Sequence, residues 1–330
     1  MNPEEAEREK RIDRIFSPYA FDQMDKYIQA QADPTHVRFV HYTSADAALR
    51  IIQSKRVWMR NATSMSDFSE VQHGYTMLSK LFAGGDHNQM FTDALDACFP
   101  GTAREAREIF DSWRNDISLN TYIASIAEHP TSEDLHGRLS MWRAFGGSRN
   151  PVRVAIVVKV PMSVLDAGVF NLVFSPVAYL DDQQVAEQFL RAMVSIRESQ
   201  NFLKSVGRDR VVRAAFNMLT AGVTCQKHKG FEEEREWRLV YAPSRWPCEL
   251  IESSTETIAG VPQIVYKIPY DSSTKGVPAH FDLARLIDRI IIGPSTYPWS
   301  MVEAFAEALK NAGVTPLENR VFASTIPVRL

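Results

Sequence analysis

Alternating hydrophobic and polar residues predict strands that recur from residue 37 to near the end of the chain. The clearest strand is the β-branched run at 153–160, and a second strong one at 286–292 stops at Gly293-Pro294. Shorter strands are predicted at 37–42, 57–60, 121–127, 176–180, 234–241, 265–268 and 321–323. Because no linker separates these strands, the pattern predicts one mixed-sheet domain of the α+β class.

Hydrophobic residues at helical spacing predict helices between the strands. A helical extension is expected over residues 1–34, with its helix running from 4 to 30 and ending before Pro34. Other helices are predicted at about 45–54, 71–84, 88–117, 139–145 and 299–312, with two long helices inside 183–221. The expected organisation is therefore a single domain over 35–330 with helical insertions near 71–117 and 183–221.

Composition narrows the class of protein but not its chemistry. The chain has 330 residues, of which 45% are hydrophobic and 23% charged, as is ordinary for a soluble globular protein. A net charge of -3 gives no overall positive potential that would indicate nucleic-acid binding. A local basic patch remains an alternative, because the net charge averages over it. Three separated cysteines favour neither a zinc site nor a disulfide framework. With no apolar run of membrane-spanning length and no signal peptide, a cytoplasmic protein without a membrane partner is expected.

The first stretch with candidate chemistry is the predicted strand that ends in His41, Tyr42, Thr43 and Ser44. Polar groups at the end of a buried strand are where α/β and α+β enzymes commonly expose their reactive side chains. The alternative is a packed histidine whose ring nitrogens are satisfied by neighbours, and His41 taken alone favours that interpretation.

The second stretch is the strand at 234–241. Side chains alternate across a strand, so Trp237 marks the core face and Glu234, Glu236 and Arg238 share the other. That charged face is either solvated, with weak surface ion pairs, or a carboxylate held by Arg238 and directed into a cleft. In the same way, Trp142 is either a core residue or a platform on which a flat ring stacks. The chain has no P-loop, Rossmann glycine fingerprint, zincin helix or nucleophile elbow.

Taken together, these stretches resemble a bacterial family of domains of unknown function over about residues 37–330. The resemblance is carried by His41-Tyr42-Thr43-Ser44, Met65 to Glu70, Ser125 to Glu128, Met141 to Phe145, Lys229 to Arg238, Ile291-Ile292-Gly293-Pro294 and the ending Ser324 to Arg329. The chain departs from the family pattern at Ser66, Phe68 and Phe145, where asparagine, proline and tyrosine are usual.

The layout is also similar to that of ADP-ribosyltransferases, in which an early strand ends in His or Arg and a late strand delivers Glu-x-Glu. This resemblance implies NAD as substrate, with no metal. It implies that Glu236 stabilises an oxocarbenium-like ribose, that Glu234 orients the nucleophile and that Arg238 keeps Glu236 ionised. The implied NAD-binding residues are His41, Tyr42, Thr43, Ser44, Trp142, Tyr179 and Arg238, and His41 is also counted as catalytic.

The hypothesis is therefore an NAD-dependent ADP-ribosyltransferase, a toxin or antiphage effector that modifies nucleic acid or protein. The alternatives are an NAD glycohydrolase or nuclease on the same scaffold, and a non-catalytic sensor or binding module of a defence system. The expected partners are NAD, an unidentified macromolecular acceptor and an antitoxin or regulatory partner. The enzymatic hypothesis requires His41 and Glu236 to meet across one cleft.

Overall fold

The fold is built on one open mixed sheet, confirming the predicted α+β class. The computed structural model describes residues 3–33, 35–64, 68–114, 120–144, 152–161, 169–258 and 260–327. The strands are β1 (His36–Ser44), β2 (Arg56–Asn61), β3 (Tyr122–Glu128), β4 (Arg153–Pro161), β5 (Val173–Pro176), β6 (Glu236–Tyr241), β7 (Glu252–Ile258), β8 (Val261–Pro269), β9 (Ile287–Ile292) and β10 (Val321–Ala323). Their order is β10-β9-β4-β1-β3-β2-β8-β7, and β6 joins β3 to β5. Only β10 and β9 run parallel among these pairs.

Strand β3 is the point where the sheet divides. One edge of β3 pairs with β6 from Tyr122 to Ala127. The other edge pairs first with β2, at Tyr122 and Ile123, and then with β1, at Ala127 and Glu128. Between these two pairings, residues 124–126 have no ladder partner on that edge among the described strands. Strands β1 and β2 therefore separate at the middle of β3.

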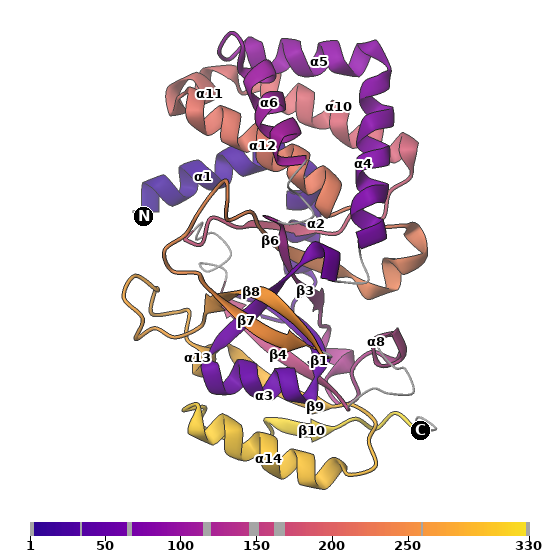
Figure 1. The fold of residues 1–330 in the computed structure, drawn as a ribbon, viewed down its shortest axis with the longest axis vertical. Coiled ribbons are helices and arrows are strands. Elements are labelled where there is room, and N and C mark those ends of the chain that lie inside the picture. Colours follow the sequence, from indigo (N-terminus) through magenta and orange to yellow (C-terminus); the bar gives the residue numbers. More distant parts are fainter. Residues whose placement is uncertain are drawn as a thin grey trace.

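Two helices cover one face of the sheet at one end of the molecule (Figure 1). Helix α3 (Ala45–Ser54) and helix α14 (Pro298–Asn311) bury Ile52 and Phe305 against Ile156 of β4 and Ile290 of β9. Helix α3 begins where the sequence predicts it, because the Ser44 hydroxyl accepts a hydrogen bond from the amide of Ala47.

The remaining long helices gather in a layer at the opposite end (Figure 1). They are α1 (Pro3–Phe16), α2 (Pro18–Gln29), α4 (Phe68–Ala83), α5 (Gly85–Asp96), α6 (Thr102–Arg114), α10 (Asp182–Glu198), α11 (Gln200–Val206) and α12 (Arg208–Thr224). Residues 71–114 and 183–221 thus meet in one layer, whose core includes Trp113 and Phe216. Ile12 and Phe16 of α1 belong to the same core, so the N-terminal helices pack into this layer.

The helix boundaries differ from the predicted ones at proline and glycine. The helix expected over 4–30 is two helices, since Pro18 opens α2 at a position where proline suits a helix start. The segment 183–221 holds three helices instead of two, because Gly207, with φ of 96°, separates α11 from α12. The predicted helix ends at 117 and 145 lie outside the described residues.

Three strands also differ from the prediction. The strand expected at 176–180 is β5, which ends at Pro176. The segment at 229–234 forms a 3₁₀ helix, η3 (Lys229–Glu234), and Arg235 is left-handed with φ of 46°, so β6 begins only at Glu236. Strand β7 was not predicted, because its exposed serines and threonines give no hydrophobic alternation. No helix within the described ranges is long and apolar enough to cross a membrane.

Gly74 allows α4 to lie directly against α12. A Cβ atom on residue 74 would overlap the carbonyl oxygen of Val223, a backbone atom that cannot swing aside. We therefore expect Gly74→Ala to lower the free energy of unfolding by about 1–3 kcal/mol, despite the higher helix propensity of alanine. Urea denaturation measures this loss. Gly85→Ala is the matched control, because nothing lies within 4 Å of the added methyl group, and equal stability of the two variants would contradict the close helix contact.

Candidate functional site

A cluster of five charged side chains lies between the sheet and the helical layer. This charge cluster consists of Glu70, Lys227, Glu234, Glu236 and Arg238. The ammonium of Lys227 is its centre, with Nζ 2.6 Å from Glu234, 3.0 Å from Glu70 and 3.3 Å from Glu236. The ammonium thus occupies the point where three carboxylates converge. No three His, Cys, Asp or Glu side chains in the described ranges gather as ligands for a metal ion.

Arg238 joins this cluster to both layers of the fold. Its Nε donates to Glu236 at 2.8 Å, and its terminal nitrogens donate to Glu70 on α4 at 2.5 Å and to the carbonyl of Thr224 on α12 at 2.6 Å. Arg238 is 0% exposed and Glu236 is 6% exposed. The interpretation of a solvated charged face is therefore wrong, because the helices cover this face of β6.

The two glutamates of the Glu-x-Glu pattern have their acidities shifted in opposite directions. Burial raises the pKa of Glu236, but the nearby Arg238 and Lys227 outweigh it and lower the pKa to about 2. At Glu234 burial is the largest effect, and it raises the pKa even though Lys227 opposes it. Glu236 is thus firmly ionised at neutral pH, whereas Glu234 takes up a proton more readily.

Tyr179, which the sequence hypothesis names as an NAD-binding residue, lies beside the charge cluster. Its hydroxyl accepts a hydrogen bond of 3.0 Å from the backbone amide of Glu236. Burial, together with the charge of Glu236, raises the pKa of Tyr179, so the hydroxyl stays protonated. The segment after β5 thereby fixes the first residue of β6.

His41 lies on the opposite face of the sheet from Glu236. Val40, Ala127 and Glu236 face each other across neighbouring strands and share one face, so His41, next to Val40, points to the other. Its Nδ1 donates to the carbonyl of Ser125 at 2.8 Å, in the gap between β1 and β2, and burial lowers the pKa of the ring. No hydrogen bond or ion pair of the described residues joins His41 to the carboxylates of the cluster. The expectation that His41 and Glu236 meet is therefore not met.

The other residues proposed for NAD binding have structural partners. Tyr42 and Trp142 are 9% and 6% exposed and pack edge to face, with ring centroids 4.9 Å apart. A Cβ on Gly293 would lie 3.0 Å from the indole of Trp142, so that ring is enclosed. Ser44 caps α3, and Thr43 pairs with Val154 of β4. Tyr42 and Trp142 thus follow the core interpretation, and no open face is left for a stacked nicotinamide ring.

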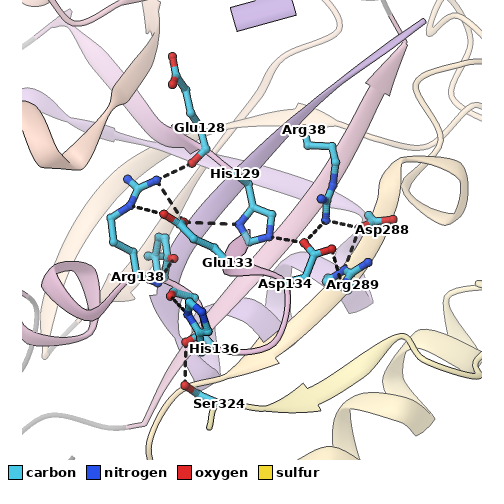
Figure 2. A network of polar contacts seen from close by, with 12 residues as sticks. Arg38, Glu128, His129, Glu133, Asp134, His136, Arg138, Asp288, Arg289 and Ser324 are labelled. Atoms are coloured by element: carbon cyan, nitrogen blue, oxygen red, sulfur yellow. Dashed lines mark hydrogen bonds and ion pairs between the residues drawn. The ribbon is translucent and has the colours of Figure 1, made fainter. Parts of the chain in front are cut away.

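Sequence reasoning missed Arg138, which positions the turn that carries Glu234. Figure 2 shows its guanidinium between the Glu133 side chain and the carbonyl of Glu128. Its NH1 also donates to the carbonyls of Glu233 and Glu234, at 3.1 and 2.7 Å. The backbone amide of Arg138 donates to the Tyr42 hydroxyl at 2.8 Å. An arginine in a polar loop gives no sequence signal for such a role.

The stretches that carried the family resemblance come together around this arrangement. The indole nitrogen of Trp142 and the hydroxyl of Ser324 both donate to the carbonyl of His136, as the lower part of Figure 2 shows for Ser324. The indole of Trp237 donates to Glu128 at 3.1 Å. Of the three departures from the family pattern, Ser66 and Phe145 lie outside the described residues.

A family model described as "Protein of unknown function (DUF2971)" matches residues 141–239. The match supports the resemblance to a family of domains of unknown function over that part of the chain. It includes Trp142 and Tyr179 and, apart from Glu70, the whole charge cluster. No curated protein and no solved structure matched the chain.

Buried His129 gives the fold a pH dependence that can be measured. It is 0% exposed, with Nε2 3.0 Å from Asp134 (Figure 2), and burial together with Arg38 lowers its pKa from 6.5 to about 4. Between these values the unfolded chain binds more protons at His129 than the folded chain does, so the contribution of His129 to the free energy of unfolding decreases as pH falls from 6.5 to 4. The slope of this contribution reaches about 1.4 kcal/mol for each pH unit. Asp13, whose pKa burial raises to about 7, contributes in the opposite direction.

We expect His129→Gln to remove this contribution, so that the free energy of unfolding falls less, relative to wild type, as pH is lowered from 7 to 4 in urea unfolding. An unchanged slope in His129→Gln would contradict a neutral, buried His129.

Proposed function

We propose that this chain is an NAD-dependent ADP-ribosyltransferase with an ADP-ribosyltransferase-like arrangement of its sheet. In this proposal the charge cluster is the catalytic centre without His41, which lies on the opposite face of the sheet. The observation that carries the proposal is the asymmetry of two neighbouring carboxylates. Glu234 and Glu236 share the ammonium of Lys227, but only Glu236 also binds Arg238. Their environments therefore suit them to two different tasks in one reaction.

The proposed reaction replaces nicotinamide at the anomeric carbon of the ribose. Nicotinamide leaves with the electron pair of the glycosidic bond, and an oxocarbenium-like centre develops on the sugar. Glu236, which stays ionised, stabilises that positive charge. The acceptor then forms a bond to the anomeric carbon and loses a proton, which Glu234 takes up. Three carboxylates against two cations leave the cluster one negative charge in excess, which favours the cationic state.

Arg138 would support this chemistry as a positioning residue. It binds the carbonyls of Glu233 and Glu234, so it holds the left-handed turn that precedes β6. That turn joins Glu234 at the end of η3 to Glu236 at the start of β6, and both side chains contact the ammonium of Lys227. The acceptor in this proposal is a nucleic acid or a protein.

A second candidate function, a non-catalytic binding or sensor module, is favoured by how fully the cluster is paired. Glu236 is 6% exposed and bonded to both cations, and Tyr42 and Trp142 present no open ring face. In that case the cluster would hold the helical layer on the sheet and react with nothing.

Labelled NAD separates these functions. We would incubate purified protein and NAD, labelled in the ADP-ribose part, with DNA, RNA and cell lysate, and measure label in each fraction and free nicotinamide. The transferase should label one fraction. Glu236→Gln should lower the rate by about 100-fold or more, because one preorganised stabilising charge is removed. Glu233→Gln, the same change at an exposed neighbouring position, is the control and should keep the wild-type rate.

Each other outcome has a defined meaning. Nicotinamide released without transfer would identify a glycohydrolase. Glu234→Gln, which changes the less buried carboxylate, should reduce transfer more than nicotinamide release if Glu234 takes the acceptor's proton. If the wild-type protein turns over no NAD with any fraction, the proposal fails and the binding module becomes the better function. Circular dichroism of each variant confirms that it is folded.

A further inference from the structure

An apolar pocket lies in the helical layer, beside the charge cluster. Cys225 lines it, and Arg238 binds the carbonyl of the preceding residue, Thr224. Its volume is about 150 Å³. It is enclosed by the junction of α1 and α2, by α4, α10 and α12, and by the segment that follows β5. None of its lining side chains is charged. The pocket is open to solvent on one side, and its volume is that of a cavity that takes up a benzene-sized molecule.

Gly222 lines this pocket at an exposed position. It lies near the end of α12, and a Cβ atom there would meet nothing within 4 Å. Glycine inside a helix lowers helix stability by about 1 kcal/mol relative to alanine. The chain therefore has a helix-destabilising residue at a position where a larger side chain would fit. The contrast with Gly74, whose added methyl group would strike α12, shows that close packing does not require Gly222.

The walls are rich in sulfur atoms and aromatic rings. Met77, Met218 and Cys225 supply sulfur, while Phe16 and Phe189 supply rings. Methionine sulfur attracts the edge of an aromatic ring, and aromatic rings pack favourably edge to face. These groups suit an unsaturated ring better than a saturated chain of the same volume.

We propose that this pocket binds one neutral aromatic ring of a small ligand. The volume admits a single ring system, the uncharged walls exclude an ionised group, and the sulfur atoms and aromatic walls select a ring. Two glutamines, Gln188 and Gln226, line the pocket and can hydrogen-bond one polar substituent. The proposal is independent of the reaction proposed for the charge cluster.

The experiment uses indole as probe and the full chain labelled with ¹³C at its methionine methyl groups. Of the 11 methionines, Met77 and Met218 line the pocket, and Met77→Leu and Met218→Leu assign their signals. We expect indole to shift these two signals saturably, through the ring current, and to leave the others in place. Cyclohexanol, a saturated ring of similar bulk, should bind at least about tenfold more weakly, a difference of about 1.4 kcal/mol.

Filling the pocket should abolish this binding without harming the fold. Gly222→Leu, and Ala178→Leu from another wall, should each weaken indole binding by about tenfold or more, and Gly222→Leu should not lower the melting temperature. Val194→Leu adds apolar bulk at a site that is 50% exposed on α10, and it should bind indole as the wild type does. The proposal is overturned if the wild type shows no saturable shift, if both filled variants bind indole normally, or if cyclohexanol binds equally well.

Discussion

The structure depends on the burial of one guanidinium. Arg238 is withdrawn from water, and an unpaired charge in that place would cost several kcal/mol. It is tolerated because three elements supply acceptors: β6 itself, α4 through Glu70 and α12 through the carbonyl of Thr224. The sheet and the helical layer are therefore joined by directional bonds as well as by apolar contact. This requirement fixes where α4 and α12 meet relative to β6.

Some parts of the fold follow directly from the sequence. Uninterrupted β-branched residues predicted β4 and β9, and hydrophobic residues at helical spacing predicted α3. The polar strand β7 could not be predicted, because its pairing with β8 shows only in the register of the two strands. The split of the sheet at β3 was equally hidden, since it depends on which strands share one edge.

The candidate site could likewise be predicted only in part. The Glu-x-Glu-x-Arg pattern indicated Glu236 and Arg238 as candidate site residues. In the sequence, however, a charged strand face whose partners are far along the chain cannot be distinguished from a solvent-exposed one. The partner that decides its burial, Glu70, stands 168 residues before Arg238. The sequence hypothesis placed His41 on the same face of the sheet as Glu236, which is wrong. Alternation shows which residues of one strand share a face, but only the register of β1, β3 and β6 shows which faces of different strands coincide.

The long interval between Glu70 and Arg238 has a consequence for synthesis on the ribosome. At about 5–20 residues each second, Arg238 follows Glu70 by roughly 8–34 s, counted over 168 residues. Lys227, the other cation near Glu70, follows almost as late. During that time α4 can pack against α5, through Phe82 and Phe91, but it has neither its counter-charges nor α12. The contact between the helical layer and the sheet can therefore be completed only after β6 has emerged from the ribosome.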